Sequence, residues 1–386
     1  MYVSRDIESV VLKSIANYPV TTITGPRQCG KSTLAKHLIM NWDKTVYLDL
    51  ERPSDLQKLE NSEWFLNTQK GKLICIDEIQ RKPDIFPIIR SLVDEWGGNS
   101  HFLVLGSSSR ELLKQSSESL AGRISFKRLS PFVISELDSH ISLEKFLSRG
   151  GYPRSILAAD DVTSIEWRND FITSFIERDL IQYSGFHPLV MRRLWQMLAH
   201  NNGQTVNYSS LGNSLGISNV TVRNYIDLLE GTFMVEVVRP LFSNLEKRLV
   251  KAPKVYIADQ GITNALLGLT TFEQLAGHPA LGSVWEQVVL MHLKSRWPDL
   301  IFSFYRTTGG AELDLVLKSG EKTIAIECKA SRTPVLTRGN YSAIADVKPL
   351  TTFIVAPVEK GWPVQPGVEV ISLGELIMAV EGKLGD

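Results

Sequence analysis

The segment GPRQCGKST occupies residues 25–33, between an apolar run, VTTIT at 20–24, and a helix-forming run, STLAKHLI at 32–39. It fits the pattern G-x-x-x-x-G-K-[ST], whose glycines allow a tight loop with backbone N–H groups facing phosphate oxygens. The positive end of the following helix dipole would add to this cradle. A strand, a loop and a helix in this order predict a nucleotide site. Its expected contacts are Gly25, Arg27, Gln28, Gly30, Lys31, Ser32 and Thr33.

A second apolar run, LICI at 73–76, ends in two carboxylates, Asp77 and Glu78. We expect Lys31 to reach the β- and γ-phosphates, Ser32 to ligate Mg²⁺, and Asp77 to hold that ion through its water shell. Glu78 would polarise the attacking water. The alternative is that the two carboxylates only begin the next helix. No guanine-reading tetrapeptide, Asn-Lys-x-Asp or Thr-Lys-x-Asp, occurs in the chain, so ATP is favoured over GTP.

Four further polar residues are candidates for the catalytic site. The run HFLVL at 101–105 precedes a serine-rich turn, where Ser107 would contact the γ-phosphate if this strand lies beside the Asp77 strand. Its neighbour Ser108 is equally placed, and a plain serine-rich turn is the alternative. Arg123, in SLAGR at 119–123, is a candidate catalytic cation for its own or a neighbouring subunit, and Arg178 is a second. A surface salt bridge is the competing interpretation for either arginine.

The composition is that of an ordinary globular protein. Hydrophobic residues make up 43% of the chain and charged residues 22%. Lys plus Arg and Asp plus Glu number 42 each, so no net field draws the chain to nucleic acid or an anionic membrane. No apolar run approaches the roughly 20 residues that span a bilayer, and residues 1–19 lack the apolar core of a signal peptide. We therefore expect a cytoplasmic protein of two or three domains without membrane contact.

A helix-turn-helix pattern follows near residue 210. The segments 208–215 and 218–229 flank Gly216-Ile217, and Ser218 or Asn219 could cap the second helix. The expected core residues of that helix are Val222, Ile226 and Leu229. Its outward residues would be Thr221, Arg223 and Asn224, at the positions from which such helices read the major groove.

Two strand-like runs, 232–238 and 255–258, follow these helices, as in a winged helix. The segment between them is basic, which suits contacts with phosphates. Its cations are Lys247, Arg248, Lys251 and Lys254, against one acid, Glu246. The alternative is a domain that makes only protein contacts.

A carboxylate and lysine pattern lies near the C-terminus. Asp314 falls in a strand-like run, 311–317, and Glu327 and Lys329 end the next run, which begins at 323. Because strand side chains alternate, these three groups are expected on one face. Two carboxylates can hold a divalent cation, and a lysine beside them can orient a water or stabilise a phosphorane. The alternative is a solvated sheet face.

This pattern resembles the core of PD-(D/E)xK nucleases, although the leading proline is missing. Glu286, in an apolar helix at 284–293, matches the upstream carboxylate that is frequent in that fold. The resemblance implies a second Mg²⁺ site at Glu286, Asp314 and Glu327, with Lys329 beside it. Glu312 is expected on the opposite side of its strand. The cleavage activity of such a domain can also be lost.

Several motifs together resemble the prokaryotic AAA-superfamily ATPases whose carboxyl half is a domain of unknown function. They are GPRQCGKST, ICIDEIQ, LGSSS, SLAGR, GGYP at 150–153, ERDL at 177–180 and Asp259-Gln-Gly261. The resemblance covers nearly the whole chain. It implies an α/β P-loop NTPase with a parallel sheet and helices on both faces, a winged helix, and a small restriction-endonuclease-like α/β domain. The expected boundaries are 1–135 for the ATPase core, 136–189 for a helical segment completing it, 190–258 for the winged helix and 259–386 for the nuclease-like domain.

Two functions are compatible with these modules. The first is an ATPase with ATP and Mg²⁺ as cofactors that acts on DNA, as a monomer or a homo-oligomer, with a metal-dependent nuclease as a possible further activity. The second is a nucleotide-gated switch or scaffold whose nuclease-like domain is inactive and binds a protein partner.

Overall fold

The computed structural model describes residues 2–40, 42–106, 120–137, 140–180, 185–241 and 249–384. The chain divides into two units, one of residues 1–132 with 231–233 and one of residues 133–230 with 234–386. We expected the segment 136–189 to complete the ATPase core, but its helices pack within the second unit. Within the described ranges, no helix is both long and apolar enough to cross a membrane.

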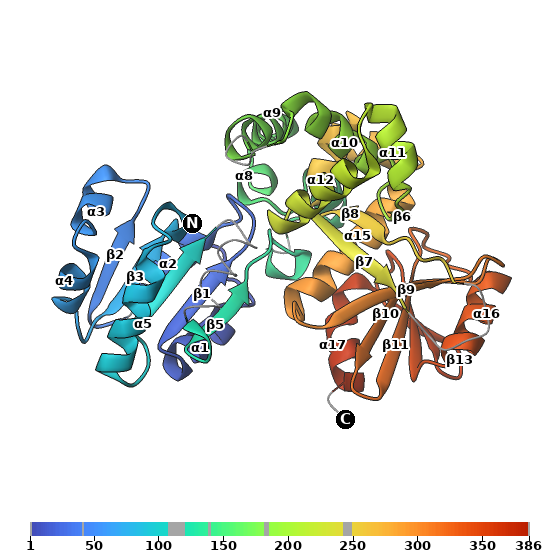
Figure 1. The fold of residues 1–386 in the computed structure, drawn as a ribbon. Helices are drawn as coiled ribbons and strands as arrows, with labels where there is room; N and C mark the ends of the chain where they lie inside the picture. The colour runs from blue at the N-terminus through green and yellow to red at the C-terminus, as the bar shows by residue number, and fades with distance from the viewer. Residues whose placement is uncertain are drawn as a thin grey trace. The chain divides into compact units, whose positions relative to one another are not determined.

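A five-stranded parallel sheet forms the centre of the first unit (Figure 1). Its strands follow the order β2-β3-β4-β1-β5, and the runs predicted at 20–24, 73–76 and 101–105 begin and end within one residue of β1, β3 and β4. The strands are β1 (Val20–Thr24), β2 (Thr45–Asp49), β3 (Leu73–Asp77), β4 (Phe102–Gly106) and β5 (Ile124–Arg128). The helices are α1 (Glu8–Asn17), α2 (Lys31–Ile39), α3 (Pro53–Lys58), α4 (Ser62–Asn67), the short η1 (Ile79–Arg81) and α5 (Ile85–Trp96).

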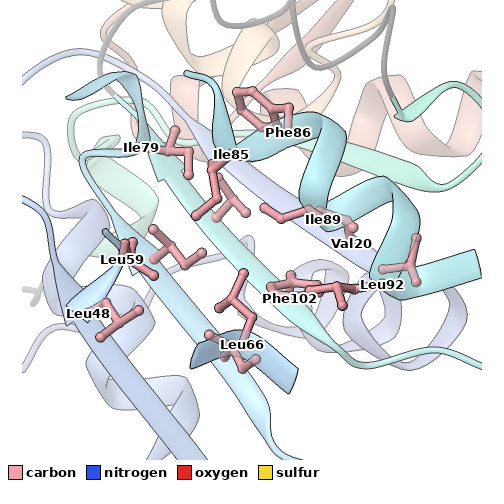
Figure 2. Close-up of a cluster of buried hydrophobic side chains, with 14 of the residues drawn as sticks. Val20, Leu48, Leu59, Leu66, Ile79, Ile85, Phe86, Ile89, Leu92 and Phe102 are labelled. Atoms are coloured by element: carbon pink, nitrogen blue, oxygen red, sulfur yellow. The ribbon is translucent and has the colours of Figure 1, made fainter. Parts of the chain in front are cut away.

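Helix α5 covers one face of this sheet. Its apolar residues recur every three or four positions, so Ile85, Ile89 and Leu92 lie on one side of the helix and are fully buried. Figure 2 shows these side chains packed against Val20 and Phe102 from the central strands. Strands β1, β3 and β4 are buried along their whole length, as in parallel sheets covered on both faces.

Helices precede most strands of the second unit. They are η2 (Ile134–Glu136), α7 (Leu143–Arg149), α8 (Pro153–Ile156), α9 (Asp161–Ser174), η3 (Phe175–Asp179), α10 (Pro188–His200), α11 (Tyr208–Leu215) and α12 (Asn219–Gly231). The later helices are α13 (Gln260–Leu267), α14 (Phe272–Ala276), α15 (Leu281–Arg296), α16 (Arg338–Val347) and α17 (Leu373–Leu384).

A nine-stranded mixed sheet unites the second unit, in the order β13-β14-β12-β11-β10-β9-β7-β8-β6 (Figure 1). Its strands are β6 (Gln204–Thr205), β7 (Val235–Pro240), β8 (Lys254–Ile257), β9 (Ile301–Arg306), β10 (Glu312–Ser319), β11 (Lys322–Cys328), β12 (Thr351–Val355), β13 (Trp362–Gln365) and β14 (Val368–Ile371). The two halves join where β7 pairs in parallel with β9, at Arg239 with Ser303 and Pro240 with Phe304. The strands predicted after the helix-turn-helix therefore belong to the same sheet as the C-terminal strands.

Two details of this sheet differ from the sequence-based prediction. Strand β7 begins at Val235 and not at residue 232, because Phe233 has a left-handed backbone with φ of 62°, which no strand accommodates. Strands β6, β13 and β14 were not predicted. They are two to four residues long, too short for a recognisable alternation of apolar and polar residues.

Candidate nucleotide site and carboxylate cluster

The predicted nucleotide-site residues follow strands that end at one edge of the first sheet. Strand β1 ends directly before Gly25, and β3 ends at Asp77. Strand β4 lies between them and pairs with both. This is the carboxyl edge of a parallel sheet, where open α/β folds bind their ligands. The strand after which Ser107 and Ser108 come therefore lies beside the Asp77 strand, as their predicted role requires. Ser107 and Ser108 themselves lie outside the described residues.

Glycine is required at the first position of the P-loop. Gly25 has φ of 154°, and a Cβ there would lie 2.1 Å from the carbonyl oxygen of Leu129. The loop therefore lies tightly against the end of β5. Gly30, with φ of 106°, occupies the position before α2, whose first turn carries a half-buried Ser32 and an exposed Thr33. In the same loop Arg27 is partly buried and Gln28 is exposed.

Two cationic side chains, Lys31 and Arg5, fix the P-loop by donating hydrogen bonds to backbone carbonyls. The Lys31 ammonium group donates to the carbonyl oxygens of Gly25 at 3.0 Å and Pro26 at 2.8 Å, and the residue is only 5% exposed. The guanidinium of Arg5 donates to the carbonyls of Cys29 at 3.2 Å and Ser130 at 2.8 Å. Arg5 was not predicted, since it is 24 and 125 residues away from those partners and no local pattern marks it.

Asp77 and Glu78 are held in fixed positions by their neighbours. Asp77 accepts the hydroxyl hydrogen of Tyr47 at 2.5 Å and the N–H of Glu78 at 3.0 Å. Glu78 accepts a hydrogen bond from the side-chain amide of Gln80. Burial raises the pKa of Glu78, while the positive charge of Lys31 lowers it. Tyr47, on the neighbouring strand β2, was not predicted. Its pKa is raised by burial and by the bond to Asp77.

Arg123 lies at the edge of the sheet opposite the candidate nucleotide site of its own chain. It stands directly before β5, and Ile124 pairs with Val20 at the start of β1, so Arg123 lies at the amino edge of the sheet. That edge is separated from the P-loop by the length of β1, roughly 16 Å for five residues. The Nε and Nη2 groups on one edge of its guanidinium donate to the two carboxylate oxygens of Asp94, at 2.5 Å and 3.0 Å. The surface salt bridge considered for Arg123 is the arrangement found. Arg178 is exposed on η3, in the second unit.

The helix-turn-helix segment has the predicted elements. Helices α11 and α12 are joined through Gly216, which is left-handed and ends α11. The Ser218 hydroxyl accepts the N–H of Thr221 at 3.0 Å and so caps α12. Helix α12 buries the three predicted apolar residues and exposes Arg223 and Asn224. The Arg223 guanidinium lies 4.7 Å from the ring centre of Tyr208.

Lys254 does not belong to the predicted basic surface. It is the first residue of β8, is 2% exposed and faces buried carboxylates. Of the other cations in that segment, Lys251 is exposed, while Lys247 and Arg248 lie outside the described residues.

The structure brings together the four residues of the nuclease-like pattern. Glu286, Asp314, Glu327 and Lys329 line one cleft of about 420 Å³ in the second unit. The Lys329 ammonium group donates to Glu327 at 2.7 Å, and Asp314 accepts the N–H of Cys328 at 2.9 Å. Burial and the charge of Asp314 raise the pKa of Glu286 to about 7 and that of Glu327 to about 8.

Glu312 lines the same cleft, contrary to the expectation that it faces the other side of its strand. Residues 312 and 314 are two apart, and side chains with that spacing share a strand face. Glu312 lies 3.3 Å from the ammonium group of Lys254 and 3.5 Å from the guanidinium of Arg306.

Known proteins resemble this chain over nearly its whole length. Family models match in succession: an AAA domain at residues 17–138, a domain of unknown function (DUF8612) at 140–273 and a domain of unknown function (DUF4143) at 281–376. The uncharacterised proteins Rv2008c of Mycobacterium tuberculosis and Mb2031c of Mycobacterium bovis are each 36% identical over 374 residues, which is 97% of this chain and 84% of the relative. The chain belongs to the family of these mycobacterial proteins.

The first unit is accordingly an AAA-type P-loop ATPase domain, and the C-terminal part of the chain carries DUF4143. Among solved structures, a Walker-type ATPase of Pyrococcus abyssi is 16% identical, with a TM-score of 0.49, over 69% of this chain and 96% of that one.

The GGYP and Asp259-Gln-Gly261 motifs meet inside the DUF8612 region. Asp259 caps α13 by accepting the N–H of Ile262 at 3.0 Å, and it also accepts the N–H of Gly151 at 2.7 Å. A Cβ at Gly150 would lie 2.3 Å from the Asp259 carboxylate. The buried Arg168 donates to the carbonyls of Ser148 and Gly261. These motifs therefore join α7, α9 and α13 in a buried polar cluster.

The carboxylate cluster in DUF4143 does not fit the expected metal ion. The ammonium group of Lys254, from the DUF8612 region, lies among Glu286, Glu312 and Asp314. Within the part of the chain that the structure describes, no group of three or more His, Cys, Asp or Glu side chains is placed to hold a metal.

Proposed function

We propose that this protein binds ATP with Mg²⁺ and hydrolyses it at the carboxyl edge of the sheet in its AAA domain. The main support is the shared edge itself, at which the P-loop after β1 and the Asp77-Glu78 pair at the end of β3 flank β4. Parallel strands that end together bring loop backbone, ammonium group and carboxylates to one ligand.

Each residue has a distinct role in this proposal. Lys31 contacts the β- and γ-phosphates, and the backbone of residues 25–30 surrounds them. Glu78 orients and polarises the attacking water, and burial raises its pKa, which makes the carboxylate a stronger base. Gly25, Arg27, Gln28, Gly30 and Thr33 complete the predicted contacts with the nucleotide.

The residues at this edge suit a magnesium ion. Ser32 offers a hydroxyl oxygen on the first turn of α2, and Asp77 offers a carboxylate whose other bonds, to Tyr47 and Glu78, fix its direction. Mg²⁺ retains several waters when bound in proteins, which matches a contact with Asp77 through water. The ion would neutralise charge that develops on the phosphates.

We also propose that the winged helix contacts DNA and responds to the nucleotide state. The arrangement α10-β6-α11-α12-β7-β8, with β8 paired to both β6 and β7, supports this assignment. Arg223 and Asn224 are exposed on the second helix of the motif, and Lys251 is exposed after β7. Cleavage is not part of the proposal, because the ammonium group of Lys254 lies among the carboxylates that would bind the metal ion.

The test is phosphate release from ATP, measured with and without duplex DNA. Lys31→Ala should abolish ATP binding, while Glu78→Gln should bind ATP and lose hydrolysis by on the order of 100-fold or more. Lys70→Ala, at an exposed lysine of the same domain, is the matched control and should be unchanged. Full activity of Glu78→Gln would contradict the assignment.

The DNA arm separates the two candidate functions. Stimulation of hydrolysis by duplex DNA that is lost in Arg223→Ala supports DNA action. Absence of any DNA effect in an active ATPase favours the second candidate, a nucleotide-gated switch or scaffold in which the C-terminal region binds a protein partner.

A further inference from the structure

The cleft in the second unit contains an unusually placed cation. Lys254 is almost completely buried, at 2% exposed, and its ammonium nitrogen lies 2.9 Å from Glu286, 3.3 Å from Glu312 and 3.6 Å from Asp314. An ammonium group has three N–H donors and no acceptor. Three carboxylates from two elements, α15 and β10, therefore surround one positive charge.

A second group from β8 supports the same arrangement. Tyr256 is two residues after Lys254, so both side chains lie on one face of the strand. The Tyr256 hydroxyl donates to the same oxygen of Glu286 that Lys254 contacts. Strand β8 thus supplies two donors to a carboxylate that would otherwise be available as a metal ligand.

The charges of the cleft are nearly balanced without a bound ion. Lys254, Lys329 and Arg306 supply three positive charges, and each is within 3.6 Å of at least one carboxylate. The opposing acids are Glu286, Glu312, Asp314 and Glu327. Buried charges are tolerated when they are paired and hydrogen-bonded. Lys254 meets that condition through its three carboxylate neighbours. Among the described residues, the Oε2 oxygen of Glu327 is buried without a hydrogen-bond partner.

We propose that Lys254 takes the place of a divalent cation in this cleft, so that the DUF4143 region holds no catalytic metal. This proposal rests on the proposed function in one respect, because that function already leaves out DNA cleavage. The substituted cation also has a structural consequence. Lys254 belongs to the sheet of the winged helix, while Glu286, Glu312 and Asp314 belong to DUF4143, so one buried ion-pair group joins the two regions.

The proposal predicts that metal binding is gained by removing the lysine. Mn²⁺ is the probe, and nucleotide-free full-length protein carrying Asp77→Asn is the parent, so that the P-loop site does not contribute. The parent should bind no Mn²⁺ at about 1 mM by electron paramagnetic resonance. Adding Lys254→Met removes the ammonium group and leaves the carboxylates converging on its former position. This variant should melt below the parent and regain roughly 2 °C or more with Mn²⁺.

Two further variants make the result specific. Asp314→Asn added to Lys254→Met should abolish the gained Mn²⁺ binding. Lys251→Met, at an exposed lysine three residues earlier, should behave as the parent. Mn²⁺ binding to the parent that is lost with Asp314→Asn would overturn the proposal, as would a folded Lys254→Met variant that binds no Mn²⁺. If Lys254→Met does not fold, the Mn²⁺ titrations of the parent and of its Asp314→Asn variant still test the proposal, which requires that neither binds Mn²⁺ in the cleft. None of these readouts depends on ATP hydrolysis, so failure here is distinguishable from failure of the proposed ATPase.

Discussion

Glu78 has a left-handed backbone, with φ of 55° and ψ of 46°. A non-glycine residue in this conformation costs roughly 1–2 kcal/mol, and such strain is concentrated at functional sites. The conformation turns the chain sharply after β3, and Gln80 on η1 then donates its side-chain amide to the Glu78 carboxylate. Gln80 is therefore expected to position Glu78 and not to contact ATP itself.

Gln80→Ala tests this role. Loss of the amide donor removes an interaction that lowers the pKa of Glu78, so the pKa rises further. We expect kcat to fall about 10-fold with the KM for ATP nearly unchanged, and the acidic limb of the pH–rate profile to move to higher pH. Gln57→Ala, at an exposed glutamine of α3, is the control. A fall in kcat with an unmoved pH profile would mean that Gln80 does not act through Glu78.

At the scale of elements, Asp259 is one of several polar residues that join α7 and α13. Asp259 satisfies the N–H groups of both Ile262 and Gly151, although burial raises its pKa to about 6. Asp160 is a simpler cap, since it accepts the N–H of Thr163 at an exposed helix start. Both residues cap a helix, but only Asp259 is buried and also accepts the N–H of Gly151.

Asp259→Ala should destabilise the protein by about 3 kcal/mol, the sum of a lost cap and a buried N–H left without an acceptor. Asp160→Ala should cost only about 1 kcal/mol. Urea unfolding of the two variants measures the difference. Equal losses would show that the GGYP loop does not depend on Asp259.

At the scale of the whole molecule, two units predict two unfolding transitions. ATP with Mg²⁺ should raise only the transition of the AAA domain, because its site lies within the first unit. The second unit contains a buried histidine, His292, which accepts the N–H of Ile134 at 3.2 Å and whose pKa is lowered by burial to about 4. This group makes the stability of the second unit depend on pH.

The direction of this pH dependence follows from the lowered pKa of His292. Well above pH 6.5 His292 is neutral in both the folded and the unfolded state, and its contribution to stability is complete. As the pH falls, the unfolded chain takes up a proton that the folded unit does not, and the free energy of unfolding drops by up to about 3 kcal/mol near pH 4. His292→Gln should remove this dependence, seen as the difference between the two pH curves from calorimetry. A wild-type curve parallel to that of the variant would contradict the assignment.

The arrangement of the candidate nucleotide site at one edge of the sheet could be predicted closely because its residues are local. Residues 25–33 are contiguous, and Asp77-Glu78 ends a strand that any parallel sheet would align with the first. Alternation along strands likewise placed Asp314, Glu327 and Lys329 on one face. The prediction for Glu312 was wrong because residues 312 and 314 are two apart, and side chains with that spacing lie on the same face of a strand.

The sequence by itself therefore determined the P-loop ATPase domain, the helix-turn-helix and the carboxylate pattern, since each depends on spacing within one or two adjacent elements. Only the tertiary structure decided which cation the carboxylates meet and which edge of the sheet Arg123 occupies. Lys254 is 32 residues from Glu286 and looks in sequence like one more basic residue of a wing. Strand pairing across the nine-stranded sheet turns it inward, and no local pattern encodes a contact made at that distance along the chain.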